Sequence, residues 1–289
     1  MKKNFTLSMR AAFLAAGLAA GATAQNLDFV GAGARALGIG GAFTGVADDA
    51  TAIYWNPAGL TQLKKTEISV MTSFVRTSYD FSQATYDYEW VPDQSLNFDF
   101  GSFIVPMSAG TNNFVVGAGR MRALGFTYIN QYDFDQDGSV DTEGFFKSSV
   151  YNTMLSAAYE FGKIFSLGFT GHLVDGGFRY KFTDMASGDV LNDGEGRIKY
   201  SGKPFLTTGV LLKLGPPARV GAFFRQNSSY TEELDEGTVY VAAPPSVVPG
   251  AWGLGGSLRV GDNLTLSGDL STTRNSKAVD EGTPREEFD

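Results

Sequence analysis

The stretch IFSLGFTGHLV, residues 164–174, alternates with a period of two. Its apolar side chains fall on one side of an extended chain, at Phe165, Leu167, Phe169 and Leu173. Small or polar residues fall on the other side, at Ser166, Gly168, Thr170 and His172. Because successive side chains of a strand point to opposite faces, this pattern predicts a β-strand with one apolar face and one small, mostly uncharged face.

The same alternation recurs along the chain after residue 65, for example in AWGLGGSLRVG (251–261) and NLTLSGDLS (263–271). In SLNFDF (95–100) it places Leu96, Phe98 and Phe100 on one face. It predicts nine strands, at 66–78, 95–105, 113–129, 146–161, 164–183, 196–214, 217–230, 250–260 and 263–273. Short connections alternate with long polar ones, at 79–94, 130–145, 184–195, 231–249 and 274–289.

Short turns at one end and long loops at the other are typical of an outer-membrane barrel. No run of 18 apolar residues follows the N-terminus, so transmembrane helices are excluded. The sequence therefore predicts an all-β fold, an antiparallel transmembrane β-barrel over residues 63–289. A soluble sandwich with one wet face is the alternative. Since a barrel must close, nine strands and the acidic, turn-like end KAVDEGTPREEFD (277–289) predict a C-terminally truncated barrel.

Residues 1–24 have the three parts of a secretory signal peptide: a basic start, an apolar centre and the small residues Ala22-Thr23-Ala24. We expect the mature chain to begin at Gln25. Because the chain is exported and is predicted to cross a membrane with strands, we expect it in the outer membrane of a Gram-negative cell. The absence of cysteine excludes disulfides, thiolate metal sites and a lipoprotein anchor. A net charge of -8 argues against nucleic acid as a partner.

Residues 25–62 do not read as a strand. GARALGIGGAFTGVADDATAIYWNPAGL (33–60) holds six glycines, an aspartate pair and an aromatic pair before Asn56-Pro57. Asp48 or Asp49 is suited to cap a short helix, and Asn56 to cap a second one with Pro57 at its first position. The pattern Gly31-x-Gly33-x-x-Ala36 resembles a dinucleotide fingerprint, but no βαβ unit surrounds it. The segment is therefore predicted to be a compact plug, called the hatch below.

At these residues the sequence resembles the outer-membrane fatty-acid and aromatic-hydrocarbon transporter superfamily, and also the related barrels that assist type IX secretion. The resemblance is carried by Arg35, by Asp48 and Asp49, and by Asn56, Pro57 and Ala58. It implies a barrel of about fourteen strands whose N-terminal segment folds inside as a hatch. It also implies passive uptake of fatty acids or hydrocarbons, with outer-membrane lipid and lipopolysaccharide as surroundings. A secretion accessory that binds exported proteins is the alternative function.

In the transporters a kink in the third strand opens the wall sideways. Carried over, this opening falls on the third predicted strand, which contains Gly117, Gly119 and Gly125. Glycine inside a strand marks bulges and kinks, although glycine is frequent throughout these strands.

An acidic loop, Asp133-Phe-Asp135-Gln-Asp137-Gly-Ser-Val-Asp141, has carboxylates at four positions of a calcium loop. Position 12 is Gly144 rather than glutamate, so either calcium binding or a solvated acidic loop fits. No other cofactor is predicted.

Four polar residues are expected to face the lumen by alternation: His172, Arg225, Arg259 and Asp269. The arginines suit either a substrate carboxylate or ion pairs along the wall. A lone histidine without a serine motif or an acid pair does not form a catalytic site, so the chain is not expected to be an enzyme.

Overall fold

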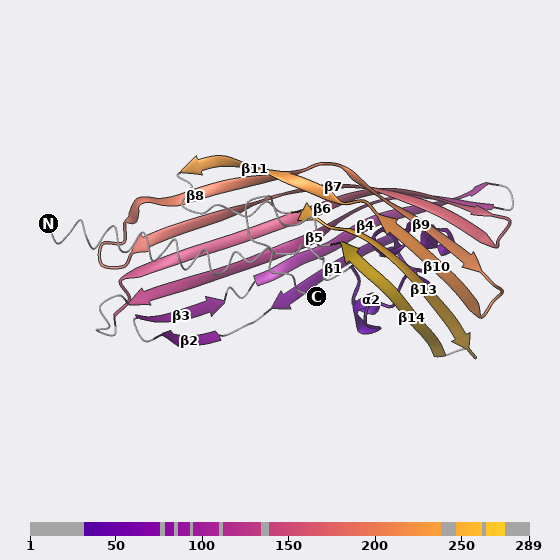
Figure 1. Ribbon diagram of the computed structural model, residues 1–289, viewed down its shortest axis with the longest axis horizontal. Coiled ribbons are helices and arrows are strands. Elements are labelled where there is room, and N and C mark those ends of the chain that lie inside the picture. The colour runs from indigo at the N-terminus through magenta and orange to yellow at the C-terminus, as the bar shows by residue number, and fades with distance from the viewer. Residues whose placement is uncertain are drawn as a thin grey trace.

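The computed structural model describes residues 32–75, 79–83, 86–92, 95–109, 112–133, 139–237, 247–261 and 264–274. These residues form one antiparallel sheet of fourteen strands and a short helical segment that precedes it (Figure 1). The helices are α2 (Ala34–Gly38), α3 (Ala52–Trp55) and the 3-10 helix η1 (Pro57–Gln62). The predicted all-β antiparallel class is confirmed.

The strands up to residue 184 are β1 (Glu67–Val75), β2 (Tyr79–Gln83), β3 (Tyr86–Pro92), β4 (Ser95–Ala109), β5 (Asn112–Asp133), β6 (Thr142–Phe161) and β7 (Phe165–Asp184). The remaining strands are β8 (Val190–Gly202), β9 (Phe205–Lys213), β10 (Ala218–Arg225), β11 (Ser228–Gly237), β12 (Val247–Val248), β13 (Gly250–Val260) and β14 (Leu264–Arg274). The main path through the sheet is β1-β4-β5-β6-β7-β9-β10-β13-β14, so each of the nine predicted strands has a counterpart on it.

Two predicted strands are broken in the structure. The predicted strand 196–214 is divided into β8 and β9 around Pro204, which has no N–H to donate to the ladder. The predicted strand 217–230 is divided into β10 and β11. As a result β7 pairs with β9 along residues 165–172 and with β8 from residue 175 onward.

Several predicted loops are wrong because the strands continue into them. The predicted loop 79–94 contains the hairpin β2–β3, which pairs with the far end of β5. The other three also contain strand: ends of β5 and β6 in 130–145, the start of β8 in 184–195, and most of β11 with β12 in 231–249. Their polar composition indicated loops, but strands that extend beyond an apolar band have polar residues on their outer face.

The prediction that Leu96, Phe98 and Phe100 share one face is also wrong. Leu96 and Phe98 are 74% and 46% exposed, whereas Phe100 is 1% exposed. The reason is a bulge: Met71 pairs with Phe100 and the next residue of β1 pairs with Phe98, so one residue of β4 is extra. A bulge reverses the alternation beyond it.

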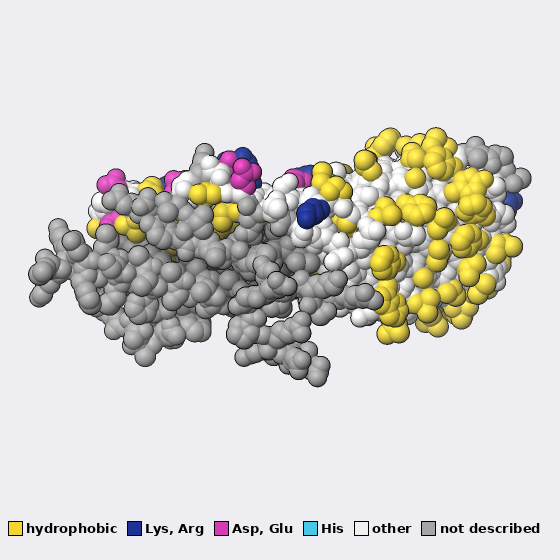
Figure 2. All heavy atoms as spheres, turned by 45° about the horizontal axis from the view of Figure 1, so that its top comes forward, with side chains coloured by type: hydrophobic (Ala, Val, Ile, Leu, Met, Phe, Trp, Pro, Cys, Tyr) yellow, Lys and Arg dark blue, Asp and Glu magenta, His cyan; other side chains and the backbone are white. Residues whose placement is uncertain are grey.

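The outer face of the sheet has an apolar band. Large apolar side chains are exposed on neighbouring strands, at Leu155, Phe169, Leu173, Leu212, Phe224, Trp252, Leu254, Leu258, Leu266 and Leu270. Figure 2 shows apolar side chains gathered at one end of the molecule, with charged side chains mostly toward the middle and the other end. A band of this kind is what a lipid-facing barrel wall requires.

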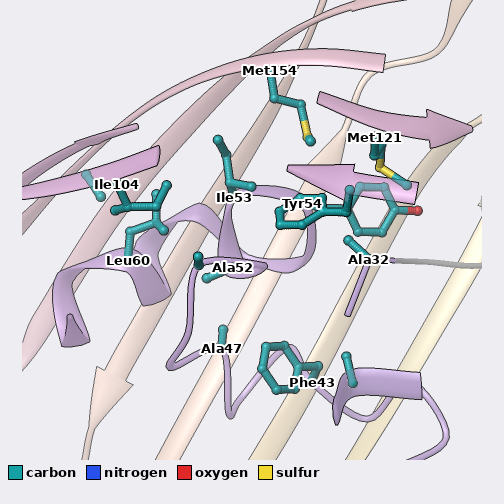
Figure 3. Close-up of a cluster of buried hydrophobic side chains, with 14 of the residues drawn as sticks. Ala32, Phe43, Ala47, Ala52, Ile53, Tyr54, Leu60, Ile104, Met121 and Met154 are labelled. Carbon is teal, nitrogen blue, oxygen red and sulfur yellow. The ribbon is translucent and has the colours of Figure 1, made fainter. Parts of the chain in front are cut away.

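The main buried core lies between the sheet and the hatch. Figure 3 shows Ile53, Tyr54 and Leu60 of the hatch against side chains from β4, β5 and β6, while Phe43 lies next to Ala47 within the hatch. The wall residues labelled there are Ile104, Met121 and Met154. A second, smaller buried cluster consists of Phe146, Tyr180 and Phe182. It lies toward the end of the sheet where the long loops were predicted.

Within the described ranges, β1 and β14 form the two ends of the strand order and do not pair with each other. No helix in those ranges is long and apolar enough to cross a membrane.

Candidate functional site

The charged residues of the hatch bind one another. Arg35 on α2 lies 2.5 Å from Asp48 and 3.2 Å from Asp49. Asp49 accepts hydrogen bonds from the backbone N–H and the hydroxyl of Thr51, at 2.9 and 2.5 Å. The N-cap of α3 is Thr51, two residues after Asp49 and three after Asp48, so the predicted cap at either aspartate is wrong. Asp49 instead forms the turn that precedes the helix.

Asn56 connects the hatch to the wall. Its side-chain oxygen accepts the N–H of Ala58 at 3.2 Å, which makes it the N-cap of η1 with Pro57 at the first position, as the sequence indicates. Its side-chain amide donates to the carbonyl of Thr44 at 2.9 Å and to that of Val210 on β9 at 3.0 Å. One fully buried side chain therefore satisfies groups in two parts of the hatch and in the sheet.

Glycines of the wall, to which the sequence analysis assigned no role, allow this close approach. A Cβ on Gly168 of β7 would overlap Pro57, and one on Gly209 of β9 would overlap the side chain of Asn56. A Cβ on Gly221 of β10 would overlap the carbonyl of Thr44. The available signal was glycine on the small-residue face of an alternating strand, where backbone meets backbone.

Further polar contacts distribute the attachment over several strands. Thr61 and Ser166 share a hydrogen bond of 2.8 Å between their hydroxyls. Asn113 on β5 donates to the carbonyl of Thr61 at 2.9 Å, and Thr170 donates to that of Ile53 at 2.9 Å. The hatch is thus attached to β5, β7 and β9 mainly through single hydrogen bonds rather than a backbone ladder.

Asp269 and Arg259 occupy different positions, although both were predicted to face the lumen. Asp269 on β14 accepts the backbone N–H of Thr44 at 2.7 Å, so it contacts the hatch. Its other oxygen is buried and has no hydrogen-bond partner in the described residues. Arg259 is exposed near the end of β13, where its backbone N–H donates to Pro217.

His172 and Arg225 belong to one buried polar network. His172 forms hydrogen bonds with Asn152 and, at 2.8 Å, with the hydroxyl of Thr207. Its ring stacks on the ring of Phe205, with the ring centroids 4.6 Å apart. Arg225 donates to Thr207 at 3.3 Å and to the hydroxyl and carbonyl of Tyr54 at 3.3 and 3.1 Å. Its guanidinium also lies over the Tyr54 ring. Among the described residues no carboxylate pairs with Arg225, so the network holds the hatch without an ion pair.

The three glycines predicted to mark a lateral opening lie in two environments. Gly117 and Gly119 are in the part of β5 that pairs with both β4 and β6. Among the described residues, the stretch 122–127 that contains Gly125 pairs only with β6. Of the three glycines, only Gly125 therefore lies where described pairing is found on one side of β5, and the lateral opening stays a prediction.

The acidic loop is only partly visible. Asp135 and Asp137 lie outside the described residues, and Asp141 donates its backbone N–H to Tyr132. Within the described ranges no group of three acidic, histidine or cysteine side chains is placed to hold a metal ion. Calcium binding by this loop stays a prediction.

A cavity of about 1180 Å³ opens at the short-turn end, beneath the hatch. It is lined by charged residues of both parts, at Asp48, Lys64, Glu160, Lys163, Lys213 and Arg219. Lys213 pairs with Glu160, and Arg219 lies 3.5 Å from Asp48 of the hatch. Residues of the hatch therefore form part of the lining of this polar cavity.

Comparison with known proteins gives the family. A family model described as "Outer membrane protein transport protein (OMPP1/FadL/TodX)" matches residues 11–190, more than half of the chain. No curated protein matches the chain.

Solved structures give weaker likenesses. A Pseudomonas aeruginosa FadL homologue is 14% identical, with a TM-score of 0.49, over 82% of this chain and 67% of that one. The Pseudomonas putida toluene transporter TodX is 11% identical, with a TM-score of 0.39, over 81% and 82%. The CymD monoaromatic hydrocarbon channel is 11% identical, with a TM-score of 0.39, over 86% and 85%. On the family match, this chain belongs to the OMPP1/FadL/TodX family of outer-membrane transport proteins.

Proposed function

We propose that this protein is a passive uptake channel for hydrophobic small molecules, fatty acids or hydrocarbons, and that the hatch is its gate. The observation that carries the proposal is the way the hatch is held. It packs a hydrophobic core against the wall but is attached by separate hydrogen bonds from Ser166, Thr170, Asn113 and Arg225. Such contacts break and re-form without unfolding a strand ladder, so the hatch has a route to a displaced state.

Family membership supports transport, and it does not favour the alternative of a secretion accessory. Equilibrium diffusion is the simplest mechanism for a channel of this kind. The free energy of a hydrophobic solute falls when the solute passes from water to an apolar environment, so uptake down a gradient needs no nucleotide.

The proposed exit is through the wall rather than along its axis. The charged mouth below the hatch is a poor path for an apolar molecule, because Glu160, Lys213 and Arg219 line it. The interruption beside residues 122–127 of β5 is flanked by Leu96 and Phe98, which are exposed and apolar. A solute that leaves there enters lipid at the outer boundary of the membrane, because residues 122–127 pair with residues 147–151 of β6, which pair in turn with residues 175–179 of β7.

The test is to cross-link the hatch to the wall with a disulfide. The natural chain has no cysteine, so a Thr61→Cys/Ser166→Cys variant carries the only two thiols, at side chains whose oxygens lie 2.8 Å apart. In proteoliposomes, uptake of labelled fatty acid or toluene is expected to stop when the pair is oxidised and to return on reduction. The two single-cysteine variants are the controls, and oxidation should not change their uptake.

Two results would contradict the proposal. Wild-type proteoliposomes with no flux above protein-free vesicles would exclude a transport channel. Full flux through the cross-linked variant would leave transport intact but exclude the hatch as the gate.

A further inference from the structure

Backbone pairing between β4 and β5 stops part of the way along the wall. The two strands pair from Ala109 and Asn112 up to Phe100 and Met121. Beyond this point the next described pair on this side of β5 is Tyr128 with Pro92 of β3, and residues 93–94, between β3 and β4 in the chain, lie outside the described residues. Among the described residues, 122–127 of β5 pair on one side with β6 and on the other side with nothing.

An ion pair lies at the first position where pairing is lost. Arg122 directly follows Met121, and Asp99 directly precedes Phe100. The Arg122 guanidinium lies 2.6 Å from a carboxylate oxygen of Asp99, and its Nε lies 3.2 Å from the same oxygen. Their side chains are only 17% and 24% exposed. A charge-assisted hydrogen bond therefore takes the place of the next backbone pair.

The local backbone is arranged around this contact. The register of β4 against β1 shifts here, between Met71 and Thr72 of β1. The register of β5 against β6 also shifts, between Arg122 and Leu124 of β5. A Cβ on Gly125 would overlap the Arg122 side chain, so glycine at that position leaves room for the guanidinium stem. Bulges re-aim side chains at the edge of paired regions, and here they bring opposite charges together.

A second ion pair on the same strand provides the contrast. Arg120 binds Asp175 of β7 through two hydrogen bonds of 2.9 and 2.7 Å, and it lies over the Tyr151 ring. It spans β5, β6 and β7, whose backbone pairing is continuous at this height. Its side chains are 42% and 46% exposed. This pair adds nothing to closure of the wall, because the ladder beneath it is complete.

We propose that Arg122 and Asp99 form a latch that holds β4 against β5 and limits the width of the lateral exit. The inference rests on the proposed function and deepens it, since it assigns control of that exit to two named side chains. With the latch closed, the apolar rim formed by Leu96 and Phe98 stays against β5. With the latch open, no described backbone pair joins β4 and β5 over this stretch, and an apolar solute passes between them.

The test compares the latch with the pair on Arg120. Arg122→Gln and Asp99→Asn are each expected to raise the initial uptake rate about three- to fivefold, the factor that corresponds to losing one partly exposed ion pair. The swap Asp99→Arg/Arg122→Asp is expected to return the rate toward wild type. Arg120→Gln and Asp175→Asn are the matched controls and should leave the rate unchanged.

A second measurement does not depend on transport. Hydrogen exchange of the amides of residues 122–127 is expected to be faster in Arg122→Gln than in the wild type, and unchanged in Arg120→Gln. Unchanged exchange in Arg122→Gln would overturn the latch, whatever the uptake assay gives. An equal effect of both variants on uptake would also overturn it. Absence of flux in the wild type would refute the proposed function, while the exchange result would still decide whether the latch exists.

Discussion

The two halves of β7 show one strand in two environments. In the first half, Phe169 and Leu173 face outward, while Thr170 and His172 are buried against the hatch side. In the second half the chemistry of the two faces is exchanged. The buried residues are aromatic, at Tyr180 and Phe182, and the outward-facing residues are charged, at Arg179 and Lys181. Pairing with β6 runs through both halves without a register shift.

The reversal therefore comes from the surroundings and not from a bulge. The first half has an apolar outer face and an inner face of small polar groups that meet the backbone of the hatch, as a wall in lipid requires. The second half has an aromatic interior and a charged exterior, as a sheet in water requires. The change between Leu173 and Arg179 is where we place the outer boundary of the membrane.

The largest expected effect comes from removing a buried aromatic side chain in the second half of β7. Phe182 packs edge-on against Phe146 at 5.4 Å and is 4% exposed. Phe182→Ala should cost about 3–5 kcal/mol, because a cavity remains. Phe169→Ala, in the other half and 42% exposed, should cost only about 1–2 kcal/mol, because lipid refills the space. Urea titration of folding into lipid vesicles measures both, and equal costs would refute the comparison.

A charge placed on each outer face tests the position of the membrane. Phe169→Arg should cost about 2–4 kcal/mol if this side chain lies near the middle of the bilayer. The reverse change in the other half, Lys181→Phe, should alter stability by less than about 0.5 kcal/mol, because that face contacts water. The same titration applies. A clear gain of stability from Lys181→Phe would mean that lipid also covers the second half.

The next effect concerns the wall beneath the hatch. Gly209→Val should destabilise the protein by about 1–3 kcal/mol, because its side chain has no space beside Asn56. It should also make the hatch easier to cleave by protease. Gly268→Val is the matched control on β14, since a Cβ there meets nothing within 4 Å. If both variants resist protease as the wild type does, the close approach is not required.

An effect of similar size is expected from removing one anchor of the hatch. Asn56→Ala should cost about 1–3 kcal/mol, because the carbonyls of Thr44 and Val210 lose their donor. Asn112→Ala should cost about 1 kcal/mol or less, because that side chain bonds Tyr159 at an exposed turn. Protease cleavage of the hatch should rise only in Asn56→Ala. Equal cleavage in the two variants would show that Asn56 is not an anchor.

Sequence patterns were sufficient for much of the fold because period two is a local property. They placed nine strands on the path of the sheet and set a hatch of short helices before them. They failed where alternation is not the deciding signal. Polar segments such as 79–94 belong to strands outside the apolar band, and a bulge moves Phe100 to the other face.

Site residues divide in the same way. Asn56 was identified because Asn-Pro is a local capping pattern, and His172 because it lies on the small-residue face. Gly168, Gly209 and Gly221 were not, because their role depends on which segment of the hatch lies opposite each of them.

By itself, the sequence determined the secondary structure class, the apolar outer face and the separate N-terminal hatch, since each follows from side-chain order over a few residues. Only the tertiary structure decided that Asn56 reaches Val210, and that Arg122 meets Asp99 where two strands part. Both contacts join residues far apart in the chain. Their geometry depends on the register and bulges of paired strands, which no local pattern of side chains specifies.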